Sequence, residues 1–248
     1  MPDWLGLRGA RAIVAGGAGT LGAAVTAALL EAGAEVAAID LDQEALARLS
    51  DQISVRHHAD LSDGDAARMA VEQCRTALGG VDVFVHCAGI NVRKPLDAYV
   101  SGEWERIMTV NLASAFYTAV EAATTMRRQQ YGRIVFFSSV SGRSGHKHHG
   151  PYAASKGGIN QFMRVMAHEY AGDGITVNAV APGYMETALT RDYLAEHPDA
   201  REALVELIPA GRFGRLEEVV GPVLFLCSRH ASFVTGQVLY VDGGRSVL

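Results

Sequence analysis

The sequence predicts an α/β fold in which a parallel sheet is covered by helices on both faces. Short runs of apolar, β-branched residues alternate with longer helical patterns along the 248-residue chain. Such alternation is typical of a parallel sheet buried between helical layers. Hydrophobic residues make up 49% of the chain, which is enough for a sizeable core. Because strand patterns continue to residue 241 without a linker, we expect one doubly wound domain over residues 1–248.

The expected elements alternate in order along the chain. Seven strands are expected at Arg11–Gly16, Glu35–Ile39, Ile53–His57, Asp82–His86, Gly132–Ser138, Ile175–Val180 and Gln237–Val241. Helices are expected at Thr20–Ala32, Gln43–Leu49, Asp65–Leu78, Gly102–Arg128, Tyr152–Ala171 and Leu216–Ser228. In such sheets ligands bind beyond the carboxyl ends of the strands. Residues directly after each strand are therefore the first candidates for a functional site.

Composition excludes several classes of function. The net charge of -5 does not suit a nucleic-acid binder. No apolar run reaches the roughly 18 residues needed to span a bilayer, and the N-terminus lacks a signal-peptide pattern. We therefore expect a cytoplasmic protein that binds neither nucleic acid nor membrane. The three cysteines form no C-x-x-C pair, so we expect buried thiols; a catalytic thiol is the alternative, and only Cys87 lies near a candidate site.

The loop after the first strand has the pattern of a dinucleotide site. Gly17, Gly19 and Gly22 satisfy G-x-G-x-x-G between a strand and a helix. Glycines let the backbone approach a pyrophosphate, whose charge is met by free N–H groups and the helix dipole. The alternative, a plain glycine turn, is less favoured by this strand–turn–helix context. The pattern predicts a Rossmann-type nucleotide site.

Asp40 follows the second strand, where a carboxylate can accept hydrogen bonds from the adenosine ribose. Its negative charge would repel a 2′-phosphate, so we expect NAD rather than NADP. The alternative is that Asp40 caps the next helix, a task that Asp42 could equally perform. Asp60-Leu61 and Ala88-Gly89 follow the third and fourth strands and are placed to approach the cofactor.

Tyr152 and Lys156 form a Tyr-x-x-x-Lys pattern that places both side chains on one helical face. A nearby ammonium should lower the pKa of the phenol, which could then exchange a proton with a substrate hydroxyl while a nicotinamide exchanges hydride. Lys156 can also hold the nicotinamide ribose. The alternative is an ordinary amphipathic surface pair.

Two further polar residues fit the same chemistry. Ser139 ends the fifth strand and could stabilise charge on the reacting oxygen. Strand alternation directs its competitor, Ser138, to the opposite side. Asn111 lies within the long helical segment and could hold a proton-relay water; its alternative is an ordinary polar helix position.

With these motifs in order, the chain resembles the short-chain dehydrogenase/reductase family over essentially its whole length. The resemblance implies catalytic roles for Asn111, Ser139, Tyr152 and Lys156. It implies cofactor contacts from Gly16, Gly19, Thr20, Leu21, Gly22, Asp40, Leu41, Asp60, Leu61, Ala88, Gly89, Tyr152, Lys156, Pro182, Gly183, Met185 and Thr187. It also implies a homotetramer.

The sequence departs from the usual family pattern in two places. Ala15 replaces a threonine before the glycine loop, and Thr20 stands where the second loop glycine is usual, with Gly19 one place earlier. His86-Cys87 replaces an Asn-Asn pair before Ala88-Gly89. All four catalytic positions are filled, which argues against the rival class of function, a non-catalytic dinucleotide sensor or assembly subunit.

The variable segments of this family suggest an acidic or polyhydroxylated substrate. Seven basic or imidazole residues gather there: Arg93, Lys94, Arg143, His146, Lys147, His148 and His149. We expect substrate contacts from Arg93, Ser141, His149, Tyr152 and Tyr184. The alternative is a solvated basic loop. No metal site is expected, because no carboxylate or cysteine accompanies the histidines.

Several stretches, including AGINVRKPL and PGYMETALT, look most like sugar-acid dehydrogenases such as gluconate 5-dehydrogenases. The predicted substrate is therefore a secondary alcohol of a sugar acid or related polyol. A hydrophobic 3-oxoacyl or cyclic ketone is the alternative substrate. The helical pattern of Met185–Ile208, interrupted by Pro198, predicts a mobile lid.

Overall fold

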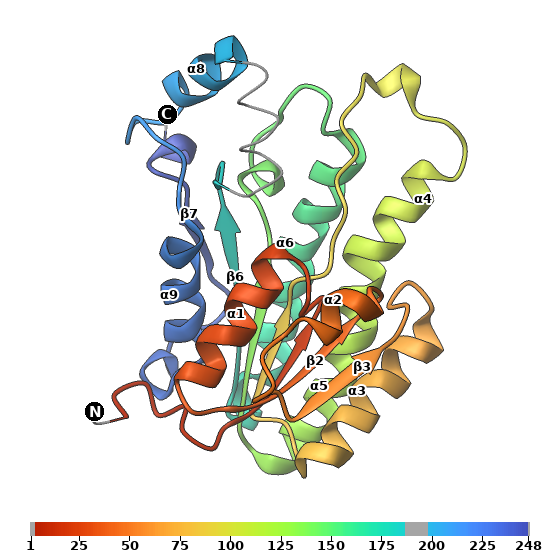
Figure 1. The fold of residues 1–248 in the computed structure, drawn as a ribbon, viewed down its shortest axis with the longest axis vertical. Coiled ribbons are helices and arrows are strands. Elements are labelled where there is room, and N and C mark those ends of the chain that lie inside the picture. The colour runs from red at the N-terminus through yellow and green to blue at the C-terminus, as the bar shows by residue number, and fades with distance from the viewer. Residues whose placement is uncertain (1–2, 187–197, 248) are drawn as a thin grey trace.

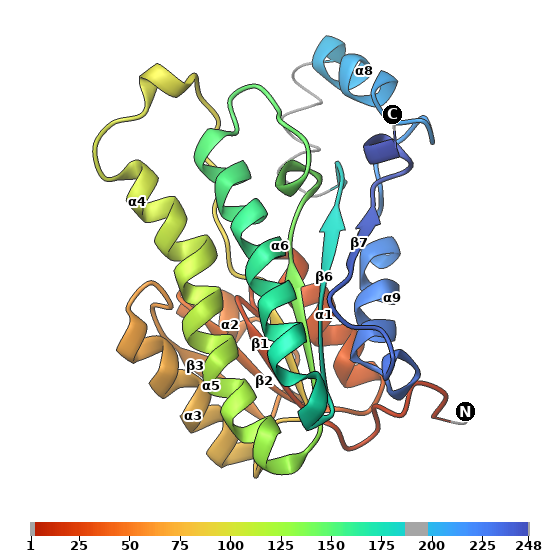
Figure 2. The ribbon, with the colours of Figure 1, turned by 180° about the vertical axis from the view of Figure 1, so that it is seen from behind.

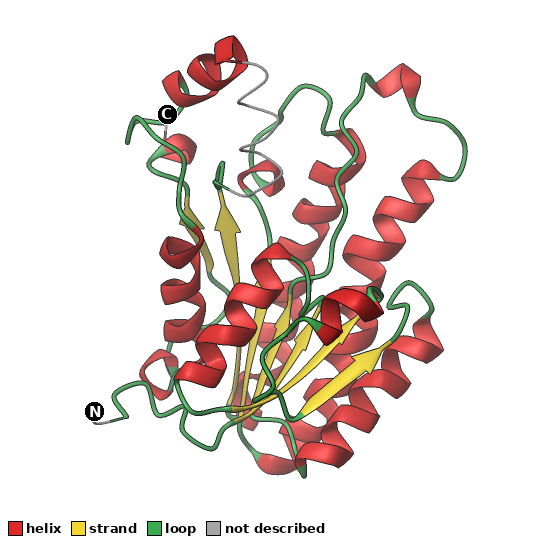
Figure 3. Cartoon of the chain, in the orientation of Figure 1, coloured by secondary structure: helices red, strands yellow, loops and turns green. Residues whose placement is uncertain are grey.

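The computed structural model describes residues 3–186 and 198–247. Its seven strands form one parallel sheet in the order β3-β2-β1-β4-β5-β6-β7. They are β1 (Arg11–Ala15), β2 (Glu35–Asp40), β3 (Val55–His58), β4 (Val83–His86), β5 (Gly132–Phe137), β6 (Ile175–Pro182) and β7 (Val238–Val241). All strands point the same way, so their carboxyl ends share one edge of the sheet (Figure 3). The predicted fold class, a Rossmann-type parallel sheet with helices on both faces, is confirmed.

Helices cover both faces of the sheet. On one face lie α1 (Thr20–Glu31), α2 (Gln43–Ala47) and α9 (Leu216–Cys227) (Figure 1). The other face carries α3 (Gly64–Leu78), α4 (Glu103–Met108), α5 (Ser114–Gln129) and α6 (Gly150–Tyr170) (Figure 2). α8 (Pro198–Glu206) lies beyond the carboxyl ends of β6 and β7. Short 3₁₀ turns are η1 (Leu96–Ala98), η3 (Val140–Gly142), η4 (Ala171–Asp173), η5 (Arg229–Ala231) and η6 (Arg245–Val247).

The core divides into two layers, one on each face of the sheet. Successive strand residues point to opposite faces, so Ile13 packs with α3, α5 and α6 while Ala12 and Val14 pack with α1 and α9. All three side chains are fully buried. Burial on both faces explains why the strands read as continuous apolar runs.

The structure differs from the predicted elements at the long helix Gly102–Arg128. This segment is interrupted by a π-helical turn, Thr109–Ala113 (η2), between α4 and α5. The pattern of apolar residues does not predict this turn, because the turn is associated with contacts that Asn111 makes outside the helix. α8 is described from Pro198 onward, the proline that interrupts the predicted helical pattern of Met185–Ile208.

The predicted lid at Met185–Ile208 includes residues 187–197, which lie outside the described residues. Its closure therefore stays a prediction, and Thr187 is likewise not placed. Among the described residues, no helix is long and apolar enough to cross a membrane.

Candidate active site

The glycine loop brings the backbone of β1, β4 and α1 into close contact. Gly16 has a φ of 72°, and a Cβ atom there would lie 2.5 Å from the backbone nitrogen of Ala88. A Cβ at Gly22 would lie 1.9 Å from the carbonyl oxygen of Gly16. Gly19, the N-cap of α1, makes no side-chain capping bond, and no acidic residue stands in the first turn. The first backbone N–H groups of α1 therefore have no side-chain partner, and they suit the pyrophosphate of a dinucleotide.

A cavity of about 450 Å³ opens beside this loop. Its lining includes eight of the predicted cofactor residues: Gly16, Gly19, Asp40, Leu41, Asp60, Leu61, Ala88 and Gly89. Thr20 and Gly22 lie in the first turn of α1, next to the cavity wall rather than on it. Four segments that are far apart in sequence thus meet at the carboxyl edge of the sheet, as the strand pattern predicts.

Asp40 holds its carboxylate in this cavity through the backbone. Its two oxygens accept hydrogen bonds from the backbone nitrogens of Ala18, at 2.9 Å, and Asp42, at 3.1 Å. The N-cap of α2 is Asp42, whose carboxylate accepts from Ala45 N at 2.9 Å. The alternative that Asp40 caps this helix is therefore wrong. Each carboxylate oxygen of Asp40 keeps a lone pair that can accept a hydrogen bond from a ribose hydroxyl.

A second cavity, of about 220 Å³, joins the first at Cys87, Gly89 and Ile90. It brings together Leu21, Ser139, Tyr152, Lys156, Pro182, Gly183 and Met185, which come from four separate stretches of the chain. All seven are predicted catalytic or cofactor residues. Their convergence is the geometry that a nicotinamide and a small substrate require.

Tyr152 and Lys156 lie together in this cavity. The Lys156 Nζ atom is 5.7 Å from the centroid of the Tyr152 ring and donates a hydrogen bond to the Phe137 carbonyl at 2.8 Å. Burial lowers the pKa of Lys156 to about 8. Burial also raises the pKa of Tyr152, while a hydrogen bond with Ser139 and the charge of Arg93 lower it. The predicted fall in the pKa of Tyr152 is wrong for the protein without cofactor, because burial outweighs the contacts that lower this pKa.

The serine and the asparagine are both held in place. Ser139 hydrogen-bonds Tyr152, whereas the Ser138 hydroxyl turns to the Lys156 carbonyl at 3.5 Å. Asn111 is fully buried in the π-helical turn. Its Oδ1 accepts from Ile90 N at 2.7 Å, and its Nδ2 donates to the Ile90 carbonyl and to Ser155 Oγ, each at 3.0 Å. Asn111 therefore ties the turn to the loop after β4 and to α6.

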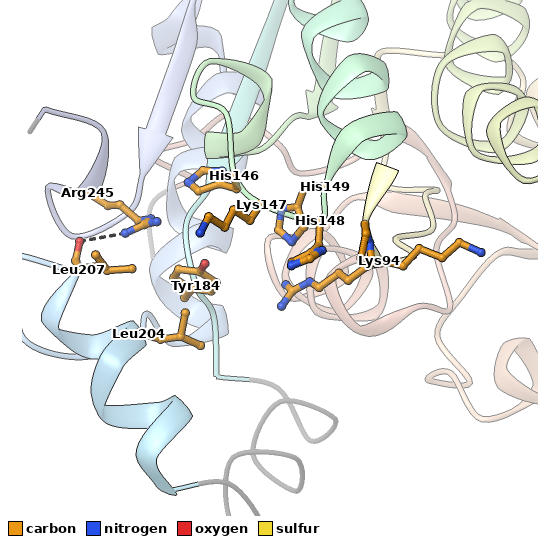
Figure 4. A pocket seen from close by; sticks show the side chains of 11 residues that line it. Lys94, His146, Lys147, His148, His149, Tyr184, Leu204, Leu207 and Arg245 are labelled. Atoms are coloured by element: carbon orange, nitrogen blue, oxygen red, sulfur yellow. Dashed lines mark hydrogen bonds between the residues drawn. The ribbon is translucent and has the colours of Figure 1, made fainter. Parts of the chain in front are cut away.

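A third cavity, of about 550 Å³ and here named the basic cavity, lies beside the catalytic one (Figure 4). Its lining is Arg93, Lys94, Pro95, His146, Lys147, His148, His149, Tyr184, Leu204, Leu207 and Arg245. The two sites adjoin at His149, whose ring centroid is 5.9 Å from that of Tyr152. No aspartate or glutamate belongs to this lining within residues 3–186 and 198–247. Of the seven predicted basic residues only Arg143 is elsewhere, with its guanidinium 5.6 Å from the Tyr240 ring centroid.

The charges in the basic cavity are unequal. Lys94 forms an ion pair with Glu103, which offsets its charge. Burial lowers the pKa of His149 to about 4 and also lowers that of His146, so both imidazoles are neutral near pH 7. The Ser141 hydroxyl lies 3.2 Å from the Nδ1 atom of each imidazole. Ser141, a predicted substrate contact, therefore positions the two histidines and does not itself line the cavity.

Two alternative chemistries find little support. Cys87 lines the first two cavities, but burial raises the pKa of its thiol and so disfavours the reactive thiolate. Within the described part of the chain, no three histidine, cysteine, aspartate or glutamate side chains are grouped as metal ligands.

Sequence reasoning did not single out Arg245 or the structural role of His86. Arg245 follows β7 closely, so the rule that ligands bind after strand ends could have found it. His86 is fully buried, and its Nε2 lies 2.9 Å from Ser114 Oγ in α5. No local pattern connects two residues so far apart in sequence.

The fold and this site define an oxidoreductase built to bind a nicotinamide dinucleotide. The family model described as "Enoyl-(Acyl carrier protein) reductase" matches residues 16–246, and the chain belongs to the short-chain dehydrogenase/reductase family.

Several relatives match along nearly their whole length. Gluconate 5-dehydrogenase of Gluconobacter oxydans is 33% identical, with 99% of this chain and 98% of that protein covered. The 3-oxoacyl-acyl-carrier-protein reductase of Salmonella typhimurium is also 33% identical, over 97% of this chain and 98% of its own. The crystal structure of a gluconate 5-dehydrogenase from Burkholderia cenocepacia, in complex with NADP and tartrate, is 34% identical and has a TM-score of 0.91, covering 99% of this chain and 98% of that one.

Proposed function

We propose that the protein is an NAD-dependent dehydrogenase that interconverts a secondary alcohol and a ketone on a sugar acid or related polyol. The basic cavity next to Tyr152 carries this proposal. Arg93, Lys147 and Arg245 line it, and no carboxylate does so among the described residues. A guanidinium or an ammonium suits a carboxylate ligand. The gluconate dehydrogenase relatives, one of them crystallised with tartrate, support the same class of substrate.

The four polar residues of the site have separate roles in this proposal. A bound nicotinamide dinucleotide supplies the acceptor or donor of hydride. Tyr152 takes the proton from the substrate hydroxyl during oxidation and returns it during reduction. Ser139 donates a hydrogen bond to the reacting oxygen, and Lys156 holds the cofactor ribose and favours the phenolate once charge develops. Asn111 fixes the loop after β4 through Ile90. The second role proposed for Asn111 is to order a water through which the proton leaves.

A panel of substrates tests the reaction. Sugar acids, uncharged polyols, apolar cyclic alcohols and, in the reverse direction, a 3-oxoacyl thioester are offered with the matching cofactor, and NADH absorbance is followed. We expect the highest kcat/KM for sugar acids, and a roughly tenfold or greater loss for them in Arg93→Gln, because a charge-assisted hydrogen bond is removed. Turnover confined to apolar alcohols or to the 3-oxoacyl thioester would overturn the substrate assignment.

The proposed preference for NAD is supported by Asp40, because its carboxylate, held by the Ala18 and Asp42 nitrogens in the first cavity, would repel the 2′-phosphate of NADP. Binding of NADP by a relative makes this a point that needs its own test. We expect a higher kcat/KM with NAD than with NADP, and a shift of that ratio toward NADP by about tenfold in Asp40→Asn, since the variant keeps the shape and removes the charge. Equal use of both cofactors by the unaltered enzyme contradicts the preference.

The assembly proposed for this enzyme is a homotetramer. Exposed apolar side chains support it: Phe116 on α5 and Val165 on α6 are 43% and 47% exposed, and Leu239 on β7 is 40% exposed.

The lid proposed at residues 185–208 would close over the nicotinamide and the substrate. Similar protease sensitivity of this segment with and without both ligands would contradict the lid.

A further inference from the structure

Arg245 reaches the wall of the basic cavity from the segment after β7. Its Nη1 atom donates to the Leu207 carbonyl at 3.2 Å, and its guanidinium carbon lies 5.1 Å from the centroid of the Tyr184 ring. The Nε atom is buried and has no hydrogen-bond partner in the part of the chain that the structure describes. A guanidinium has five N–H donors. Most of the hydrogen-bonding capacity of Arg245 is therefore unused within the described protein.

The basic and imidazole side chains of the cavity lie at two opposite sides. Figure 4 shows Arg245 on one side beside Leu207, and His148, His149 and Lys94 on the other. His149 is the residue next to Tyr152, so the Arg245 side is the one farther from the reacting phenol. The charge of Arg93 acts on Tyr152, His149 and His146, whereas that of Arg245 acts on His146. One cation thus serves the reacting end and another the distal end.

We infer that Arg245 forms a distal anion subsite, and that the substrate is a hydroxy acid with a second anionic group at the end remote from the oxidised carbon. This inference rests on the proposed function, which needs only one carboxylate. Arg93 suffices for that carboxylate, so the half-buried guanidinium of Arg245, whose buried Nε atom has no partner among the described residues, is left to bind a second anion. A cavity of about 550 Å³ has room for a ligand with an anion at each end.

Binding of an unreactive diacid tests the subsite without any turnover. Adipate and hexanoate have the same six-carbon chain and differ in the second carboxylate. With the NADH-loaded enzyme, calorimetry should give a Kd for adipate about tenfold or more below that for hexanoate. Arg245→Gln should remove most of this difference, and Arg245→Lys should keep part of it because the charge remains. Equal affinity of the two acids for the unaltered enzyme refutes the subsite.

Arg143→Gln is the matched control, because Arg143 lies over Tyr240 and outside the basic cavity. It should leave the ratio of the two dissociation constants as it is. If Arg143→Gln lowers the ratio as much as Arg245→Gln does, the effect is one of overall charge and the subsite is refuted.

Kinetics then separate this inference from the proposed function. D-Glucarate and 6-phosphogluconate carry a second carboxylate and a phosphate, respectively, at the far end of D-gluconate. We expect one of them to exceed gluconate in kcat/KM, and Arg245→Gln to reduce that advantage about tenfold. If gluconate is turned over as efficiently as both dianions, the proposed function stands and the subsite is overturned. If adipate binding depends on Arg245 but no hydroxy acid is turned over, the anion subsite stands and the proposed function is overturned.

Discussion

Lys156 keeps its amine inside the protein, where it is 4% exposed and donates a hydrogen bond to the Phe137 carbonyl. Burial disfavours the charged form, and the pKa falls from 10.5 to about 8. The folded protein therefore holds this proton less tightly than the unfolded chain does. A residue proposed to take part in the chemistry is kept here at the expense of stability, as is common at active sites.

The pKa of Lys156 predicts a pH dependence of stability. Between pH 8 and pH 10.5 the unfolded chain binds a proton that the folded protein has released, so the free energy of unfolding rises with pH. We expect it to rise by about 2 kcal/mol more in the unaltered protein than in Lys156→Met between pH 7 and pH 10. Urea denaturation of both proteins at several pH values measures this. A constant difference between them contradicts the prediction.

Tyr152→Phe separates chemistry from cofactor binding. The variant keeps the ring that packs beside His149 and loses the hydroxyl that Ser139 hydrogen-bonds. We expect kcat to fall by a factor of about 10²–10⁴, because a positioned acid or base is removed. The Kd for NADH, measured by fluorescence, should change by less than about threefold, since the glycine loop proposed to bind the phosphates is unaltered. Retained turnover would show that another group moves the proton.

The sequence allowed most of the individual site residues to be predicted, since glycines at a strand–helix turn and a tyrosine four residues before a lysine have local physical meaning. It did not allow the sign of the Tyr152 pKa shift to be predicted. That sign depends on burial by residues from several elements, and burial of one side chain is not written in a four-residue spacing. The partition of the basic residues, with Arg143 outside the cavity and Arg245 inside it, likewise depends on tertiary contacts.

At the scale of single elements, the π-helical turn at Thr109–Ala113 is the feature that presents Asn111. The Ser114 hydroxyl donates to the Val110 carbonyl at 2.6 Å, and His86 Nε2 lies 2.9 Å from the same hydroxyl oxygen. His86 thus ties β4 to the turn and so supports the position of Asn111. Its Nδ1 is buried without a hydrogen-bond partner among the described residues, and burial lowers the pKa of His86 to about 3.

His86 predicts sensitivity to acid. As the pH falls below 6.5 the unfolded chain takes up a proton that folded His86 does not accept until about pH 3, so the folded state loses stability. From pH 7 to pH 5 we expect the unaltered protein to lose about 2 kcal/mol more than His86→Asn does. Thermal unfolding with calorimetry measures this, with the exposed His168→Asn as the control. A loss that is equal in His86→Asn and the unaltered protein assigns the acid sensitivity to other groups.

Periodicity predicted the other elements well and the π-helical turn not at all. Apolar spacing reports which face of a helix is buried, and it does not report how many residues each turn contains. A π-helical turn contains one residue more than an α-helical turn. Hydrogen bonds from Asn111 to Ile90 and Ser155 hold this turn in place and join three separate segments. Such a deviation is set by tertiary structure, whereas the end of α3 at Gly79, with a φ of 73°, is set by one residue.

At the scale of the whole molecule, the strand order and the shared carboxyl edge explain why one site contains residues that are far apart in the chain. Gly16 after β1 and Gly183 after β6 lie at that edge together, although they are distant in sequence. The same architecture leaves the outer surfaces of α5 and α6 side by side (Figure 2). Phe116 on this surface contacts Phe162, with ring centroids 5.6 Å apart, yet is 43% exposed.

This apolar surface makes the assembly testable. We expect light scattering after size exclusion to give a mass near four times the 26.4 kDa of one chain. Phe116→Glu should reduce the mass to about half of that, because a two-fold interface holds two copies of each side chain and so buries two unpaired charges. Met69→Glu, on the exposed side of α3, is the matched control and should leave the mass unchanged. A monomeric unaltered protein, or a Phe116→Glu variant that remains fully assembled, excludes this surface as the interface.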